Sequence, residues 1–145
     1  MRPFRDLVVW QHAHQLTLRI YKVSEAYPRS ELFGLTSQTR RAASSVATNI
    51  VEGSARSVPE FKQFLRIALG SAAELEYHLL LGRDLGYIDT PTYVGLDAEL
   101  ASVKRMLVAF IQRLRPSDRD EESAVTRRSR STLPTAKRQG PRANA

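Results

Sequence analysis

Apolar residues recur at intervals of three and four in four long segments of this 145-residue chain, and this spacing constrains the fold more than any other feature. Residues spaced in this way lie on one side of an α-helix, so each segment predicts a helix with a single apolar face. The predicted helices cover residues 6–26, 31–52, 57–85 and 90–115. Their apolar faces comprise Trp10, Ala13, Leu16, Ile20, Val23 and Tyr27; Leu35, Ala42, Val46 and Ile50; Phe61, Phe64, Leu65, Ala68, Leu69, Ala72, Leu75 and Leu79; and Tyr93, Leu96, Leu100, Val103, Leu107, Phe110 and Ile111.

Proline, glycine and serine mark the boundaries of these helices. Ser57 and Glu60 form a capping-box pattern at the start of the third helix, because each side chain can bond the backbone amide of the other residue. Gly53 and Gly86 follow the second and third helices, where a closing residue with left-handed backbone is expected. The other boundaries are marked by Pro28, Thr90, Pro91 and Pro116.

The connections between the predicted helices are short, so consecutive helices are expected to be antiparallel neighbours. The sequence therefore predicts an all-α fold, an up-down-up-down antiparallel four-helix bundle formed by residues 1–115. Residues 116–145 are rich in Ser, Thr, Arg and Pro, and Val125 and Leu133 are their only large apolar residues. Such a segment buries too little apolar surface to offset the entropy of folding, so we expect it to be a disordered, basic tail.

The composition favours a cytoplasmic protein. The chain has no cysteine, which excludes disulfide bonds and fits a reducing compartment. No segment resembles a signal peptide or approaches the roughly 20 apolar residues of a membrane span, so no association with a membrane is expected. The net charge of +7 divides into +4 on residues 1–115 and +3 on residues 116–145. This charge indicates a polyanionic partner, although the bundle itself is only mildly basic.

The sequence lacks the patterns of a catalytic site. The three histidines, His12, His14 and His78, have no supporting ligands at suitable spacing, and we interpret them as exposed helix residues. No glycine-rich phosphate loop, nucleophile elbow or Glu-x-x-His pair occurs. We therefore expect no enzymatic activity, no metal and no cofactor.

The second predicted helix carries a polar stripe beside its apolar face, formed by Gln38, Arg41, Ser45, Asn49 and Glu52. Small residues crowd this helix and the third one, and helices with small facing residues can approach closely. We expect a partly buried polar network in which Asn49 and Glu52 meet Ser71, Glu74 or Arg41. Such a network is better suited to fixing the register of the helices than to catalysis.

Three motifs in the predicted bundle together resemble a known family. They are Phe4-x-x-Leu7-x-x-Trp10, then Gln38-x-x-Arg41-Ala42-x-x-Ser45-Val46-x-x-Asn49-Ile50-x-Glu52-Gly53, and then Phe64-Leu65-x-x-Ala68-x-Gly70-Ser71-x-x-Glu74-Leu75. Over residues 4–114 the chain resembles the four-helix bundle family of 23S ribosomal RNA intervening-sequence proteins. The accessory variability determinant of diversity-generating retroelements is similar to that family.

This resemblance implies more than a fold. It implies that the protomers assemble into a homopentameric, barrel-like ring and bind nucleic acid through basic surface. For the retroelement relatives it also implies association with a reverse transcriptase. It implies no enzymatic activity.

Two functions follow from these observations as alternatives. The first is an oligomeric accessory protein of a ribonucleoprotein, which binds RNA or DNA nonspecifically through phosphate contacts. Each contact residue has an alternative role as a solvated charge or as part of an internal salt bridge. The expected contact residues are Arg40, Arg41, Arg56, Lys104, Arg105, Arg113 and Arg115. The predicted tail either adds a flexible arm that binds nucleic acid nonspecifically or is inert. Its basic residues in question are Arg127, Arg128, Arg130, Lys137 and Arg138.

The second function is a scaffold that binds other proteins and no nucleic acid. In that case an apolar surface left over after the bundle closes would make the contacts. Aromatic residues near the helix ends are the candidates, although each could equally belong to the core: Phe4, Trp10, Phe33 and Tyr87.

Overall fold

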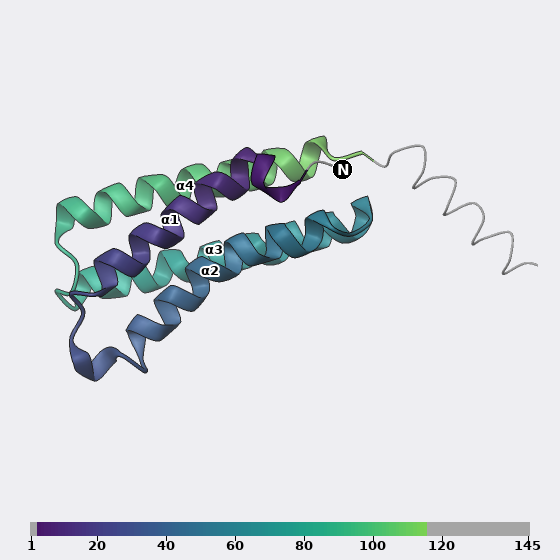
Figure 1. Cartoon of the computed structure of the whole chain (residues 1–145). Helices are drawn as coiled ribbons and strands as arrows, with labels where there is room; N and C mark the ends of the chain where they lie inside the picture. The colour runs from purple at the N-terminus through teal and green to yellow at the C-terminus, as the bar shows by residue number, and fades with distance from the viewer. Residues whose placement is uncertain (1–2, 116–145) are drawn as a thin grey trace, which may run out of the picture. The chain divides into compact units, whose positions relative to one another are not determined.

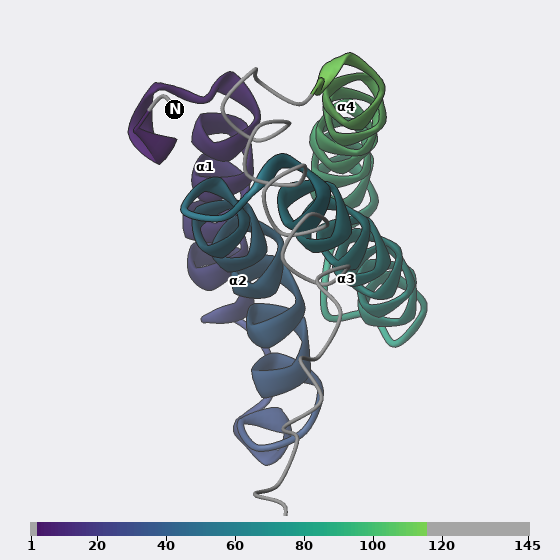
Figure 2. The same ribbon diagram turned by 90° about the vertical axis from the view of Figure 1, so that its right-hand side faces the viewer.

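Four α-helices account for most of residues 3–115, which are the residues that the computed structural model describes. Helix α1 spans Val8–Ser24, α2 Leu35–Ser54, α3 Val58–Asp84 and α4 Thr90–Arg113, and two short 3-10 helices lie at Phe4–Asp6 (η1) and Arg29–Glu31 (η2). Consecutive helices run in opposite directions and occupy neighbouring corners of the bundle (Figure 1, Figure 2). The predicted all-α, antiparallel four-helix bundle is thus confirmed. The predicted tail, residues 116–145, lies outside the described residues.

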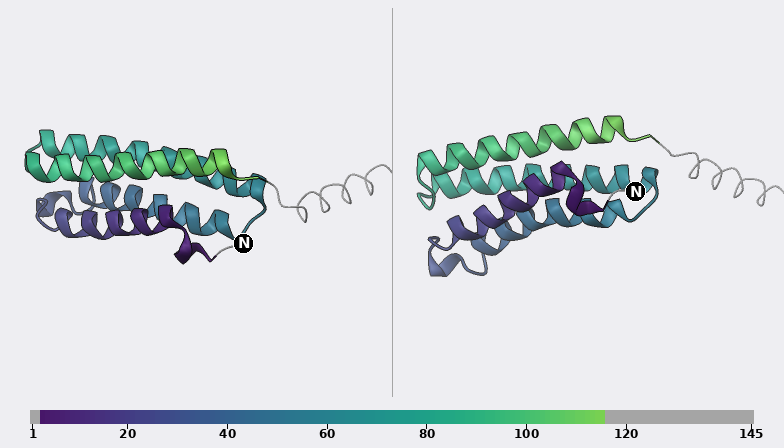
Figure 3. Two further views of the ribbon diagram at one scale, coloured as in Figure 1. Left: turned by 90° about the horizontal axis from the view of Figure 1, so that it is seen from above. Right: turned by 45° about the horizontal axis from the view of Figure 1, so that its top comes forward.

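The two ends of the bundle hold different connections. The α1–α2 and α3–α4 connections lie at one end, and the α2–α3 turn lies at the other, together with the start of α1 and the end of α4 (Figure 3). Segments that are distant in the sequence therefore meet at each end.

The apolar faces predicted from the sequence form the core. Leu65, Leu75, Leu96 and Leu107 are fully buried, and burial of one such side chain contributes about 1.5–3 kcal/mol. Tyr27 is also buried, and this burial raises the pKa of its hydroxyl to about 12. Phe64 is only partly buried. Other predicted core residues are also partly buried and pack against the core: Trp10, Val23, Leu69, Tyr93, Phe110 and Ile111.

The predicted boundaries of α3 are confirmed. The Ser57 hydroxyl accepts a hydrogen bond from the Glu60 amide at 3.5 Å, and the Glu60 carboxylate accepts one from the Ser57 amide at 3.2 Å. These two bonds make the capping box that begins the helix. Gly86 has φ of 78°, the left-handed backbone that a closing glycine provides.

Helix α2 begins later than predicted, and α4 begins at Thr90 as predicted but with a different cap. Helix α2 begins at Leu35 rather than at residue 31, because the Glu31 carboxylate accepts a hydrogen bond from the Leu35 amide at 3.2 Å and so occupies an unpaired amide of the first turn. Asp89, rather than Thr90, is the cap of α4, since its carboxylate accepts a hydrogen bond from the Thr92 amide at 2.7 Å. Hydrogen bonds from Thr92 hold the pKa of Asp89 below its usual range.

Gly53 was predicted to close α2, but this prediction is wrong. Gly53 lies inside the helix, which continues to Ser54. A Cβ atom at this position would lie 2.7 Å from Cδ2 of Phe61 and 2.7 Å from Cβ of Phe64. The glycine is therefore needed because α3 approaches α2 closely here, and not because of a left-handed backbone.

The interpretation of His78 as an exposed residue is wrong. His78 is buried on α3, and its Nδ1 is a buried atom that has no hydrogen-bond partner among the described residues. Its Nε2 lies 3.9 Å from the carboxylate of Glu74. His12 is exposed, as predicted, and His14 is partly buried because its ring stacks on Trp10.

Candidate nucleic-acid interface

The polar stripe of α2 forms a short chain of hydrogen bonds at the seam between α2 and α3. The Ser45 hydroxyl lies 2.8 Å from the Ser71 hydroxyl, and the Asn49 amide group donates to the Ser45 carbonyl at 2.8 Å and to its hydroxyl at 3.1 Å. The structure thus brings Asn49 to Ser71 through Ser45. Glu52 is exposed and its carboxylate forms no hydrogen bond within residues 3–115, so it takes no part in this chain.

The remaining members of the predicted network line a shallow hollow beside these hydrogen bonds. Gln38, Arg41 and Ser45 of α2 and Glu74 of α3 surround a space of about 350 Å³. Arg41 and Glu74 carry opposite charges, yet the two side chains form no ion pair within the described part of the chain. The hollow therefore presents a cation and an anion that are both accessible to water.

Small residues explain why this seam is close enough for two serines to bond. Ala42 of α2 and Ala68 and Ala72 of α3 are buried, and Gly53 admits the aromatic rings of α3. Backbones separated by such residues can approach more closely than those separated by leucines. The small side chains on both helices therefore make the hydrogen bonds of the seam possible.

Three of the seven cations predicted to contact phosphate are engaged within the bundle. Arg40 donates to the Ser24 hydroxyl at 2.8 Å and to the Tyr21 carbonyl at 3.2 Å, and its guanidinium lies 4.8 Å from the centre of the Tyr21 ring. It thereby supplies positive charge to the C-terminal end of α1. Lys104 forms an ion pair with Glu76 at 2.5 Å, and Arg115 donates to the Gln112 carbonyl at 3.0 Å.

The other four predicted cations, Arg41, Arg56, Arg105 and Arg113, are exposed and form no ion pair among residues 3–115. Arg56 lies in the α2–α3 turn, with its guanidinium 5.5 Å from the centre of the Phe64 ring. Arg113 is the last residue of α4 and lines a hollow of about 380 Å³ that also contains Asp6. Arg56 and Arg113 therefore belong to the same end of the bundle (Figure 3).

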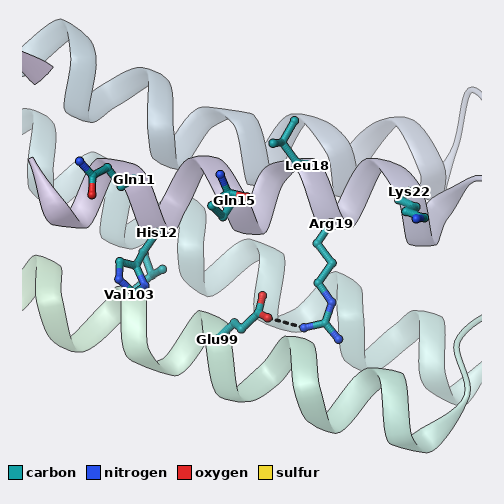
Figure 4. A pocket seen from close by; sticks show the side chains of 8 residues that line it. All are labelled: Gln11, His12, Gln15, Leu18, Arg19, Lys22, Glu99 and Val103. Atoms are coloured by element: carbon teal, nitrogen blue, oxygen red, sulfur yellow. Dashed lines mark hydrogen bonds and ion pairs between the residues drawn. The ribbon is translucent and has the colours of Figure 1, made fainter. Parts of the chain in front are cut away.

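A groove between α1 and α4 was not anticipated from the sequence. It has a volume of about 870 Å³. Arg19 forms an ion pair with Glu99 across it (Figure 4), and the Arg19 guanidinium approaches Gly95, where a Cβ atom would lie 3.0 Å from Nη2. The residues that line the groove are Gln11, His12, Gln15, Leu18, Arg19, Lys22, Glu99 and Val103.

The groove had one signal in the sequence. Helix α1 contains no acidic residue between Val8 and Ser24, whereas it contains Arg19, Lys22 and the two amides of Gln11 and Gln15. A helix with this composition favours contact with a negatively charged surface. The identity of the helix that lies opposite α1, however, depends on the fold.

The N-terminal motif is explained by aromatic packing. The rings of Phe4 and Trp10 meet edge to face with 5.0 Å between their centres, and the Trp10 ring stacks on that of His14 at 4.9 Å. Together these contacts hold η1 against the first turns of α1. Phe4 and Trp10, which were candidates for binding a protein partner, are thus engaged with each other.

Among residues 3–115 no group of three or more His, Cys, Asp or Glu side chains is placed to hold a metal ion. No helix in the described part of the chain is long and apolar enough to cross a membrane.

The fold and the seam define the class of the protein as a small antiparallel four-helix bundle with a polar, small-residue α2–α3 seam. Comparison with known proteins identifies the family: residues 5–109 match the model of the 23S rRNA-intervening sequence proteins, and the chain belongs to that family.

The chain is also similar to a solved structure. This is a protein of unknown function from the S23 ribosomal protein family of Bacteroides thetaiotaomicron, with a TM-score of 0.68 and 26% sequence identity. The match covers 72% of the present chain and 96% of the other one. A search among curated proteins gave no match.

Proposed function

We propose that this protein is a non-catalytic, oligomeric accessory component of a ribonucleoprotein, which binds RNA or DNA nonspecifically through phosphate contacts. The observation that carries the proposal is the set of four exposed cations, Arg41, Arg56, Arg105 and Arg113, that form no ion pair among residues 3–115. A cation that is already paired must lose its partner before it contacts phosphate, whereas these four need not. Contacts to phosphate position a nucleic acid without reading its sequence.

The distribution of charge supports the end of the bundle that holds the α2–α3 turn as the main contact surface. Arg5, Arg56, Lys62, Arg113 and Arg115 lie in the segments that meet at this end, against the three carboxylates Asp6, Glu52 and Glu60. The segments at the opposite end carry a small excess of carboxylates over cations: Lys22, Arg29 and Arg83 against Glu25, Glu31, Asp84 and Asp89. A polyanion is therefore attracted to one end more than to the other.

Assembly would strengthen this attraction. The family resemblance indicates a homopentamer, and five bundles of +4 would together carry a charge of about +20. Neighbouring rows of cations would then contact several phosphates of one strand at once. As a ribonucleoprotein component, the assembly would also contact a protein, for which the resemblance indicates a reverse transcriptase.

The test is a titration of labelled single-stranded RNA and of duplex DNA with the full-length protein at about 50 and 200 mM salt. We expect the affinity to fall steeply between the two concentrations. The variant Arg56→Gln/Arg113→Gln should weaken binding of all sequences and lower the slope of log affinity against log salt by roughly 2, about 1 per lost contact. No binding of either nucleic acid at the lower salt concentration would contradict the proposal.

A matched control removes the same charge from the opposite end. Arg29→Gln/Arg83→Gln lowers the net charge by the same amount, and both residues lie in segments beside the α1–α2 and α3–α4 connections. This variant should keep most of the affinity and the salt slope. Equal losses in the two variants would mean that only the total charge matters and that the basic end has no special role.

A second candidate function, a scaffold that binds other proteins, is favoured by a different observation. The side chain of Phe33 is 93% exposed and that of its neighbour Leu32 is 50% exposed. Adjacent exposed apolar residues of this size are typical of a surface that contacts a protein. If the titration shows no nucleic-acid binding, this function becomes the leading one.

A further inference from the structure

The exposed side chain of Phe33 lies on a loop that is fixed by hydrogen bonds. Gly34 donates to the Glu31 carbonyl at 2.9 Å, Leu32 donates to the Arg29 carbonyl at 3.1 Å, and the Glu31 carboxylate accepts from Leu35 at 3.2 Å. These bonds hold the Leu32–Phe33 pair between η2 and α2, with the phenyl ring 93% exposed. Burial of a phenylalanine side chain removes roughly 150–250 Å² of surface from water. A partner that covers Phe33 would therefore gain binding free energy from this burial.

The same chain offers a groove that can receive such a ring. The α1–α4 groove has a volume of about 870 Å³, and its lining includes Leu18, which is 51% exposed, whereas Val103 borders the groove but is itself buried. Gln15, Arg19 and Lys22 follow one another along α1, opposite Glu99 and Val103 of α4 (Figure 4). The groove therefore combines one exposed apolar side chain, Leu18, with a polar rim, and protein-binding surfaces also combine apolar and polar groups.

The charges of the loop and the groove are complementary. The α1–α2 connection, residues 25–34, carries Glu25, Arg29 and Glu31, a net charge of −1. The groove lining carries Arg19 and Lys22 against Glu99, a net charge of +1. Lys22 is exposed and forms no ion pair in the described part of the chain, so it is free to meet a carboxylate of the loop.

We infer that the Leu32–Phe33 loop of one copy of this chain inserts into the α1–α4 groove of a second copy. The loop and the groove are different surfaces, so the contact is head-to-tail, and a bound pair of copies still has one free loop and one free groove. A contact of this kind propagates into a closed ring when its rotation closes, and into an open filament when it does not. The inference rests on the oligomer of the proposed function and names the surfaces that build it.

Cysteine cross-linking tests the contact directly, because the natural sequence contains no cysteine. The full-length variants Phe33→Cys and Gln15→Cys each place one thiol, the first on the loop and the second on the rim of the groove. After mild oxidation, an equimolar mixture of the two variants should form a disulfide-linked dimer. A single molecule cannot produce this product, since each carries only one of the two thiols.

Each variant alone serves as a control, and neither should form a covalent dimer. A third variant, Val94→Cys, places a thiol at an apolar residue of α4 that is 58% exposed and outside the groove lining, and it should not link to Phe33→Cys. A dimer of Phe33→Cys with itself would mean a symmetric contact between two loops and would overturn the inference.

Light scattering of Phe33→Ala provides an independent measurement. Because the phenyl ring is almost wholly exposed, we expect unchanged helix content and an association at least about 30-fold weaker, the loss typical of an aromatic anchor at an interface. Val94→Ala is the matched control and should assemble normally.

The outcomes separate this inference from the proposed function. An oligomer that survives Phe33→Ala and gives no mixed disulfide overturns the loop-and-groove contact but leaves the oligomer intact. A monomeric full-length protein overturns both the contact and the oligomer. Nucleic-acid binding is measured separately by the titration, and its failure alone does not affect the contact.

Discussion

The α2–α3 seam and the α1–α4 seam of the bundle are built in opposite ways. Helices α2 and α3 pack most extensively of all neighbouring pairs, with alanine, glycine and serine between them. Helices α1 and α4 contact each other least of the four neighbouring pairs, with arginine, glutamine and glutamate between them. One seam is bonded through the serines 45 and 71, whereas the other is a groove crossed by the Arg19–Glu99 ion pair.

The comparison shows how side-chain size distributes rigidity in a small bundle. Small residues let the backbones of α2 and α3 approach, so that the register of these helices is fixed by steric contact and by short hydrogen bonds. Long polar side chains keep α1 and α4 apart and leave a surface that water or another molecule fills. The family motif of α2 belongs to the closed seam, and the inferred binding groove belongs to the open one.

Truncation of leucine should give the largest difference in unfolding free energy between the buried core and the open seam. Leu75→Ala removes a fully buried side chain of α3 and should lower the free energy of unfolding by about 2–5 kcal/mol. Leu18→Ala, at a residue of the groove that is 51% exposed, should cost less than about 1 kcal/mol. Urea unfolding at low protein concentration measures both, and equal losses would show that the groove is part of the core.

Glycine substitution should have opposite signs at the two seams. Gly53→Ala places a Cβ atom 2.7 Å from Cβ of Phe64, which cannot move without its backbone, so we expect a loss of about 1–3 kcal/mol. Gly95→Ala meets only the flexible end of Arg19 at 3.0 Å, and alanine favours a helix by roughly 0.5–1 kcal/mol over glycine. We therefore expect Gly95→Ala to be neutral or stabilising.

Gly70→Ala is the control for the glycine pair. A Cβ atom at this position of α3 would have no atom within 4 Å, so the variant reports helix propensity alone. It should stabilise the protein by roughly 0.5–1 kcal/mol. Thermal unfolding of the three variants gives the comparison, and a stabilising Gly53→Ala would contradict the close approach of α3 to α2.

The serine pair should show a measurable coupling across the closed seam. Ser45→Ala, Ser71→Ala and the double variant form a cycle, and we expect a coupling of about 0.5–1.5 kcal/mol between the two hydroxyls. Asn49 also bonds Ser45, so the single variant at residue 45 should cost more than the one at residue 71. Additive effects would show that the hydroxyls do not bond in solution.

The ion pair of the open seam should contribute less to the stability of the bundle than the interactions tested above. The side chains of Arg19 and Glu99 are 40% and 45% exposed, so the double-mutant cycle of Arg19→Gln and Glu99→Gln should give a coupling of about 0.2–1 kcal/mol. The coupling should also decrease at high salt, unlike that of the serine pair. A coupling that is larger than the serine value and insensitive to salt would reverse the comparison of the seams.

Most of the fold was predictable because its signals are local. The apolar spacing located the four helices, and the capping box at Ser57 and the glycine at residue 86 placed two boundaries correctly. The start of α2 at Leu35 and the cap of α4 at Asp89 were misplaced, because they depend on hydrogen bonds to the carboxylates of Glu31 and Asp89 that other polar residues nearby also had the chemistry to make.

The candidate site was predictable only in part. The sequence placed Ser45 and Asn49 on one stripe beside the small residues, but it did not determine that Ser71 bonds Ser45 while Glu52 stays outside. In the sequence all seven cations were equivalent candidates for contacts to phosphate. In the structure Arg40 is bonded to the end of α1 and Lys104 to Glu76. These distinctions depend on which helix lies opposite, and at what rotation, and no local pattern encodes that.

By itself the sequence determined the helices, their apolar faces, the family motifs and the net charge, because each of these depends on residues within a few turns of one another. Only the tertiary structure decided that Gly53 is required by the aromatic rings of α3, that His78 is buried, and that the α1–α4 seam is open. The physical reason is that distances between helices follow from how complete sets of side chains pack together. A single residue in that packing acquires its role only from the neighbours that the fold provides.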